Sequence, residues 1–301
     1  MLAYLRRQAY HFITPTPATH ERVLRHKLPG PSRDLRDAFG WSLPFDPTIL
    51  AGGLLQALLS AGHLAAEGDA IRSNVRVSSL GPNLFVHSAF PTEAEDSVFF
   101  GPDSYRFADL IARELSRCPE RDGARLVDIG TGAGVGGIAA AMLCPNVEIA
   151  LTDVNPKALA FARVNAAAAG VRSDFHLTSD LSPIEGDLDL IFANPPYIIN
   201  AAARTYRDGG GMHGAEVSLD MAKEAVPRLA PAGRFVLYTG SAIIDGQDAL
   251  QAALSSLADD QHCALDYREI DPDVFGEELD EPAYHGVERI ALVSAVIERG
   301  R

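Results

Sequence analysis

The fold of this chain is decided by residues 127–134, which read VDIGTGAG. The apolar run RLVDI, typical of a buried strand, leads into this stretch, and the run VGGIAAAML, typical of a helix, follows it. A glycine-rich turn between a strand and a helix marks the edge at which parallel sheets bind ligands. Glycines there let the backbone approach a ligand closely, and the helix N-terminus offers free N–H groups. The stretch therefore predicts an α/β fold with a ligand at this turn.

From residue 104 onward, helix-like and strand-like runs alternate, which is the pattern of a parallel sheet with helices on both faces. The last two strand-like runs have no helix between them and can pair antiparallel. The prediction is a doubly wound, seven-stranded, mostly parallel sheet with a Rossmann-like order. The predicted strands are 125–129, 147–152, 174–178, 188–193, 234–239, 263–270 and 287–297, and the predicted helices are 103–117, 135–143, 155–169, 215–229 and 246–258.

The first 95 residues have a different pattern. Short helical runs, RDLRDAF and DPTILAGGLLQALLSAGHL, precede two alternating segments, AIRSNVRVS and NLFVHSAF, which are joined through Gly81 and Pro82. Helices followed by a small hairpin resemble a winged-helix-like α+β module. We therefore expect a substrate-recognition module over 1–95 and a catalytic domain over 96–301.

Composition sets the broad class. Hydrophobic residues make up 47% and charged residues 22% of the 301 positions, as in folded globular proteins. The formal charge of −14 argues against a protein that coats nucleic acid non-specifically. The charge is uneven, however: residues 1–44 carry seven basic against three acidic side chains, +4, whereas residues 258–301 carry −8. An anionic substrate could still dock at the N-terminal part.

Cysteine usage and hydropathy indicate the compartment. Cys118, Cys144 and Cys263 are too few and too scattered for a disulfide framework, and no metal site is expected. The N-terminus has no secretory signal pattern, and the segment 50–66 is broken by polar residues. The expectation is a cytoplasmic protein that does not span a membrane.

Two cofactor classes fit the glycine loop. The run GAGVGG over 132–137 matches the dinucleotide pattern GxGxxG, with Asp153 on a ribose. Asp128, however, stands two residues before the first glycine, where a carboxylate would repel a pyrophosphate and attract a sulfonium and its amino group. This favours S-adenosylmethionine over NAD.

Two further acids follow the next two strands. Asp153 can accept hydrogen bonds from both ribose hydroxyls, and Asp180 is placed to receive the exocyclic amine of adenine. Each acid could instead cap a helix or turn, because Asp153 precedes NPKAL and Asp180 precedes LSP.

The tetrapeptide Asn194-Pro195-Pro196-Tyr197 follows the buried strand LDLIFA and should leave the same edge of the sheet. The Asn194 side-chain oxygen and the Pro195 carbonyl can each accept one N–H of an –NH2 group, while the two prolines hold the backbone rigid. Tyr197 can stack on a flat substrate. The arrangement suits methylation of a planar amine or amide nitrogen, and it could otherwise be only a rigid turn.

These residues resemble the class I S-adenosylmethionine-dependent methyltransferases of the NPPY branch, which have a small methyltransferase domain. The branch includes the HemK-like release-factor glutamine methyltransferases and the adenine-amine methyltransferases of DNA, ribosomal RNA and transfer RNA. The resemblance covers about residues 96–301 and implies that Asn194 through Tyr197 bind the acceptor nitrogen. The residues expected at the cofactor are Asp128, Gly130, Thr131, Gly132, Gly134, Asp153, Val154, Asp180 and Asn194.

The sequence departs from the glutamine methyltransferases ahead of the glycine loop. They carry an Arg-Pro-Glu-Thr-Glu-like segment there, whereas residues 99–110 read FFGPDSYRFADL. Phe100, Tyr105 and Phe107 are expected to roof the cofactor pocket, and release factor is a doubtful substrate. The expected partner is a macromolecule, RNA or protein, although a small molecule also fits.

The segment after NPPY is rich in glycine and is expected to form a pliable cover over the acceptor site. Arg204, Arg207 and His213 would be its polar contacts, and His213 could accept a proton or simply be solvated. Two other functions compete with the enzyme: a nucleic-acid-binding module whose methyltransferase fold senses cofactor, and an NAD-dependent oxidoreductase.

Overall fold

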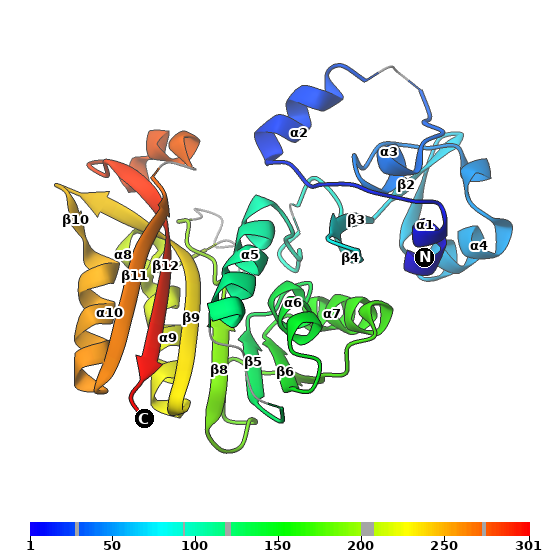
Figure 1. The fold of residues 1–301 in the computed structure, drawn as a ribbon. Coiled ribbons are helices and arrows are strands. Elements are labelled where there is room, and N and C mark those ends of the chain that lie inside the picture. Colours follow the sequence, from blue (N-terminus) through cyan, green and yellow to red (C-terminus); the bar gives the residue numbers. More distant parts are fainter. Residues whose placement is uncertain (28–29, 93, 118–121, 200–207, 273–274) are drawn as a thin grey trace.

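The computed structural model describes residues 1–27, 30–92, 94–117, 122–199, 208–272 and 275–301. A large twisted sheet with helices on both faces forms its C-terminal part, and the N-terminal part lies beside it, next to α6 (Val135–Leu143) and α7 (Pro156–Ala169) (Figure 1). Within the described residues, no helix is long and apolar enough to cross a membrane.

The central sheet has the strand order β11-β12-β9-β8-β5-β6-β7, with β10 paired to β9. Strands β7, β6, β5, β8 and β9 run parallel to one another, whereas β12 is antiparallel to both β9 and β11, and β10 is antiparallel to β9. The predicted doubly wound, mostly parallel sheet is therefore confirmed, and so is the antiparallel last pair. The strand bounds are β5 (Arg125–Ile129), β6 (Glu148–Asp153), β7 (Asp174–Leu177), β8 (Leu188–Ala193), β9 (Leu229–Ile244), β10 (Gln247–Asp248), β11 (Cys263–Asp271) and β12 (Arg289–Arg299).

Helices cover both faces of this sheet. Side chains of α5, α6 and α7 share one core with Leu126 and Phe192, and side chains of α9 and α10 share the other with Val127 and Ile191. This alternation along β5 turns Asp128 toward the α5–α7 face. The remaining bounds are α5 (Pro102–Arg117), α8 (Gly211–Gly214), α9 (Glu216–Ala225), η2 (Val226–Arg228), α10 (Ala249–Asp260), η3 (Gly276–Asp280) and η4 (Pro282–Tyr284).

The N-terminal part contains short helices and two separate hairpins. The predicted hairpin over Gly81 and Pro82 is present as β3–β4, but the segment 70–78, expected as one strand, divides at Asn74. The Asn74 backbone N–H donates to the His63 carbonyl (2.8 Å), and its side chain donates to the Gly62 carbonyl (2.9 Å), so the chain changes partner there. The bounds are α1 (Leu2–Arg7), α2 (Pro17–Leu24), α3 (Leu35–Phe39), η1 (Pro47–Ile49), α4 (Gly52–Ser60), β1 (Leu64–Glu67), β2 (Ala70–Ser73), β3 (Val75–Leu80) and β4 (Asn83–Ser88).

One apolar core joins the N-terminal part to the glycine loop. Val77 and Phe85 of the β3–β4 hairpin belong to the same buried cluster as Phe100, Ala133 and Phe161. The division at residue 95 stays a prediction, and its two sides share this core.

A buried basic cluster lies inside the N-terminal part. The Arg76 guanidinium donates to the Gly40 carbonyl (2.6 Å) and lies 2.6 Å from Nδ1 of His20, whose ring is fully buried between Trp41 and Phe90. Burial, together with the Arg76 charge, lowers the pKa of His20 to about 4. The folded protein therefore holds His20 neutral at pH values where an unfolded chain protonates it.

This arrangement predicts a loss of stability in mild acid. An unfolded histidine takes up a proton near pH 6.5, so stability that is present above that pH is lost as the pH falls toward 4. The free energy of unfolding can be measured in denaturant titrations at pH 7 and at pH 5. Between these pH values it should fall by about 2 kcal/mol less in His20→Gln than in the unsubstituted protein. Parallel pH profiles for the two proteins would contradict the account.

Candidate functional site

The glycine loop between β5 and α6 leaves its backbone accessible. Gly132 has a left-handed φ of +55°, and a Cβ added there would meet no atom within 4 Å, so space is open beside it. Gly134, with φ +84°, is the N-cap of α6, and a Cβ there would lie 3.2 Å from Cβ of Ala162 on α7. The first position admits a ligand, and the second allows two helices to approach each other.

Asp128 is the buried acid beneath this loop. Its side chain is 1% exposed, and its carboxylate accepts hydrogen bonds from Thr131 Oγ1 (2.6 Å) and the Gly137 N–H (2.8 Å). Burial raises the pKa of Asp128 to about 7 in spite of these donors. A Cβ at Gly136 would lie 3.0 Å from both carboxylate oxygens and 2.7 Å from the Phe107 ring. The loop thus closes tightly around a carboxyl group that a neighbouring cation would keep ionised.

Asp153 ties the end of β6 to the same loop. One of its oxygens accepts from the Gly132 N–H (2.8 Å), and the other accepts from the Asn155 N–H (2.8 Å). The residue that caps α7 is Asn155, which accepts from the Lys157 N–H. Beside Asp153, residue Val154 is 53% exposed and offers an apolar surface at the carboxyl edge.

Asp180 is exposed and bonded within its own turn. Its Oδ1 accepts hydrogen bonds from Ser182 Oγ (2.7 Å), the Ser182 N–H (3.0 Å) and Thr178 Oγ1 (3.0 Å). The bonds from Ser182 and Thr178 lower the pKa of Asp180 below its ordinary value. These bonds show that Asp180 stabilises its own turn, which is the alternative role stated for it above. Its contact with adenine stays a prediction.

The tetrapeptide at 194–197 leaves the sheet beside the glycine loop. Ala193, the last residue of β8, lies opposite Ile129 of β5, so Asn194 and Gly130 follow neighbouring strand ends. Asn194 is half-buried, and none of the described residues hydrogen-bonds its side chain. The two predicted regions thus meet at one edge.

Tyr197 is enclosed from several sides. Tyr197 is 7% exposed, and its ring stands edge-on to that of Phe275 with ring centres 5.5 Å apart. The ring also lies against the backbone of Gly240, since a Cβ added to Gly240 would be 2.5 Å from Cδ2 of Tyr197. Its hydroxyl is buried near the Asp103 carboxylate, and burial raises the pKa of Tyr197 well above its ordinary value. Because so little of the ring is exposed, its stacking on a substrate stays a prediction.

Asp103, which sequence reasoning missed, lies at the start of α5 behind this motif. It is 8% exposed, accepts a hydrogen bond from the Tyr238 hydroxyl (2.9 Å) and has Arg106 Nη1 at 3.6 Å from its Oδ1. Burial raises the pKa of Asp103 above its ordinary value. The only sequence signal was its place in the FFGPDSYRFADL segment.

The aromatic residues of that segment face different neighbours. Phe107 is buried beside Gly136, Phe192 and Tyr238, below the glycine loop. The Tyr105 hydroxyl, by contrast, accepts a hydrogen bond from the Thr14 N–H (2.9 Å), on the side of the N-terminal part. Contact of Tyr105 and Phe107 with a cofactor stays a prediction.

The described part of the glycine-rich segment is closely packed. The Gly209 N–H donates to the Ile198 carbonyl (2.9 Å), and a Cβ at Gly214 would lie 2.4 Å from the Tyr197 carbonyl oxygen. Around this contact the glycines allow the backbone segments to approach closely, and the pliable cover stays a prediction. His213 is half-buried with a φ of +53°, and Arg204 and Arg207 lie outside the described residues.

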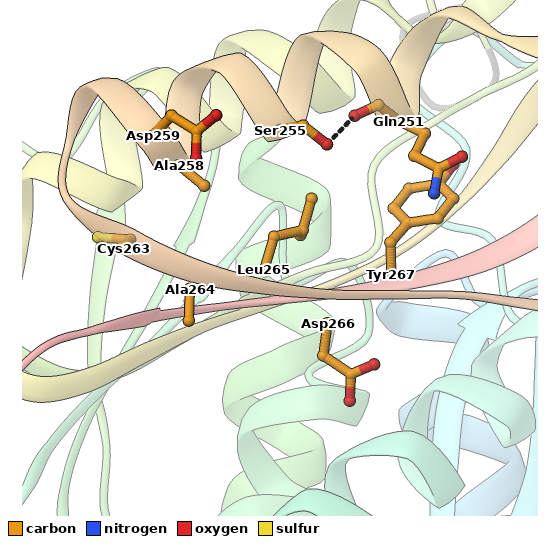
Figure 2. A pocket seen from close by; sticks show the side chains of 9 residues that line it. All are labelled: Gln251, Ser255, Ala258, Asp259, Cys263, Ala264, Leu265, Asp266 and Tyr267. Atoms are coloured by element: carbon orange, nitrogen blue, oxygen red, sulfur yellow. Dashed lines mark hydrogen bonds between the residues drawn. The ribbon is translucent and has the colours of Figure 1, made fainter.

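A groove lies at the opposite edge of the sheet, between α10 and β11. Figure 2 shows it lined by side chains of the two elements, among them Gln251, Cys263 and Tyr267. None of the predicted site residues lines it, and β12, β9 and β8 separate β11 from the glycine loop strand.

Comparison with known proteins decides the family. The sequence profile of the methyltransferase small domain matches residues 108–258. The chain belongs to the methyltransferase small domain family. This membership confirms the resemblance found from VDIGTGAG and NPPY, and it favours a methyltransferase over an NAD-dependent oxidoreductase.

Relatives of this methyltransferase include proteins with different named substrates. A release factor glutamine methyltransferase of Deinococcus radiodurans is 31% identical over 183 residues, 59% of this chain and 63% of the relative. A ribosomal RNA small subunit methyltransferase C of Serratia proteamaculans is 29% identical over 140 residues, 41% of this chain and 40% of the relative. The matches therefore span less than two thirds of these relatives' own lengths.

A solved structure shares the fold. Trm5b from Pyrococcus abyssi superposes with a TM-score of 0.53 at 14% identity, over 79% of this chain and 62% of that one. The Rossmann-like methyltransferase fold predicted from the sequence is confirmed.

The environment of Asp128 predicts a pH-dependent affinity for a cationic cofactor. Because its pKa is about 7, the Asp128 carboxyl group, which is expected to attract a sulfonium, becomes ionised as the pH rises through that value. Calorimetric affinity for S-adenosylmethionine should rise roughly eightfold between pH 6.0 and 7.5. Asp128→Asn should bind more weakly and lose this pH dependence, whereas Asp259→Asn, on α10, should keep it. A flat profile for the unsubstituted protein would contradict the prediction.

Proposed function

We propose that this chain transfers a methyl group from S-adenosylmethionine to a planar amine or amide nitrogen. The observation that carries the proposal is the meeting of Asn194 with the glycine loop at one edge of the sheet. A methyl donor and a poorly nucleophilic nitrogen must be held in line for the transfer, and adjacent strand ends can hold both.

The glycine loop and two acids fit the donor. Asp128 would hold the sulfonium end by charge, Asp153 would hold the ribose, and Val154 would lie against the adenine. The open space at Gly132 and the N-terminus of α6 leave room for close backbone contacts. When bound, the cofactor supplies an electrophilic methyl group on a positively charged sulfur.

The acceptor nitrogen would be oriented by two oxygens of the tetrapeptide. The Asn194 side-chain oxygen and the Pro195 carbonyl each accept one N–H, which turns the nitrogen lone pair toward the methyl group. The same oxygens stabilise the positive charge that develops on nitrogen during transfer. Pro195 and Pro196 restrict the backbone, and the packing around Tyr197 fixes the end of the motif.

The acceptor is proposed to belong to a macromolecule, RNA or protein, in the cytoplasm. The names of the relatives, which refer to release factor and ribosomal RNA, support this class. The N-terminal part, with its excess of basic residues over 1–44, is proposed to dock the substrate. Release factor remains a doubtful choice because residues 99–110 lack the segment typical of the glutamine methyltransferases.

Methyl transfer can be measured directly with cofactor tritiated at the methyl group. The full chain is incubated with separated RNA, DNA, protein and small-molecule fractions, and radioactivity is expected in RNA or protein. Asn194→Ala should lower the rate about 100-fold because one oriented acceptor is lost, with cofactor affinity retained. Asn146→Ala, an exposed residue after α6, serves as the matched control and should keep full activity. Substantial turnover by Asn194→Ala would place the acceptor site elsewhere.

A further inference from the structure

Asn165 is a buried amide on α7 that joins distant parts of the chain. It is 1% exposed, and its Oδ1 accepts a hydrogen bond from the Val86 N–H (2.8 Å). Its Nδ2 group donates to the carbonyls of Val86 (3.0 Å) and Ala133 (2.8 Å). Val86 belongs to the β3–β4 hairpin and Ala133 to the glycine loop, so one side chain binds the backbone of both.

The bonds to Val86 imitate the pairing of peptide groups between neighbouring strands. Val86 stands opposite Val77 in the hairpin, and its N–H and C=O are turned toward α7 instead of toward β3. Buried peptide groups of this kind need partners. Asn165 provides both, so it sets how the hairpin sits on α7.

The bond to Ala133 acts on the shape of the glycine loop. The carbonyl of the peptide between Ala133 and Gly134 is held by Asn165, and its N–H donates to the Thr131 carbonyl (2.8 Å). The neighbouring Gly132 N–H is held by Asp153 (2.8 Å). The loop backbone is therefore fixed from the α7 side by a residue that lies beneath it rather than on its ligand side.

We propose that Asn165 is a positioning residue that couples the glycine loop to the β3–β4 hairpin. Through it, the N-terminal part controls the affinity of the loop for the cofactor, and the cofactor in turn holds the hairpin in place, because such coupling is reciprocal. Apolar packing follows the same path, since Val86, Ala133 and Phe161 share one core. The inference rests on the proposed function in requiring the cofactor at this loop.

The first test compares cofactor affinity in variants of the full chain. Asn165→Ala and Asn165→Asp both remove the donors to Val86 and Ala133. Affinity for S-adenosylhomocysteine, measured by calorimetry well below the unfolding temperature of each variant, should fall at least tenfold.

The matched control is Tyr10→Phe. The Tyr10 hydroxyl donates to the Val77 carbonyl (2.8 Å), so its removal breaks one buried bond to the other strand of the same hairpin. This variant should lose thermal stability and keep its affinity within twofold. An equal loss of affinity in Tyr10→Phe would mean that general loosening of the hairpin, and not Asn165, controls the loop.

Hydrogen exchange measures the coupling in the unsubstituted protein, even if the Asn165 variants do not fold. S-adenosylhomocysteine should slow exchange of the Val86 N–H at least fivefold more than that of the Ser79 N–H, which donates to the Phe12 carbonyl. Equal slowing at the two amides would overturn the coupling. Unchanged affinity in the Asn165 variants would overturn it too and leave the proposed function standing, whereas no binding by the unsubstituted protein would refute both.

Discussion

The site depends on one carboxyl group, Asp128, which the fold buries under a loop of glycines. Burial opposes its ionisation, and among the residues that the structure describes the Thr131 hydroxyl and the Gly137 N–H are the groups that offset that cost. Gly136 has to be a glycine for the helix to approach so closely. A buried acid with a pKa of about 7 contributes little to the stability of the fold, but it is well suited to bind a cation. A sulfonium cofactor carries such a positive charge.

The proposed acceptor side is held in place by packing more than by hydrogen bonds. Register places Asn194 beside Gly130, and contacts from Gly240, Phe275 and the 208–214 segment then immobilise Tyr197 behind it. Asp103 of α5 packs behind the motif and accepts a hydrogen bond from the Tyr238 hydroxyl. The elements that we propose for donor and acceptor are thereby held on neighbouring strands, which suits a reaction that requires in-line geometry.

The sequence predicted what short-range patterns determine. Strands 125–129 and 188–193 and helix 135–143 agree with the structure at both ends, because buried parallel strands are continuous apolar runs bounded by glycine or polar turns. It could not predict the break at Asn74, whose cause is a pair of contacts with residues 62 and 63. The roles of Asp103 and Asn165 could not be predicted either, because each is a single polar residue in a helix, and their hydrogen-bond partners lie 135 and 79 residues away along the chain.

The central claim is that one sheet edge holds the methyl donor and the acceptor motif face to face. A crystal structure of the full chain with S-adenosylmethionine tests it most directly. The account predicts the amino acid end of the cofactor beside Asp128, the ribose at Asp153, and the methyl group directed at Asn194, with space between them for an acceptor nitrogen at about 3–3.5 Å from the methyl carbon. A cofactor bound away from this edge, or one whose methyl group points away from Asn194, would contradict it.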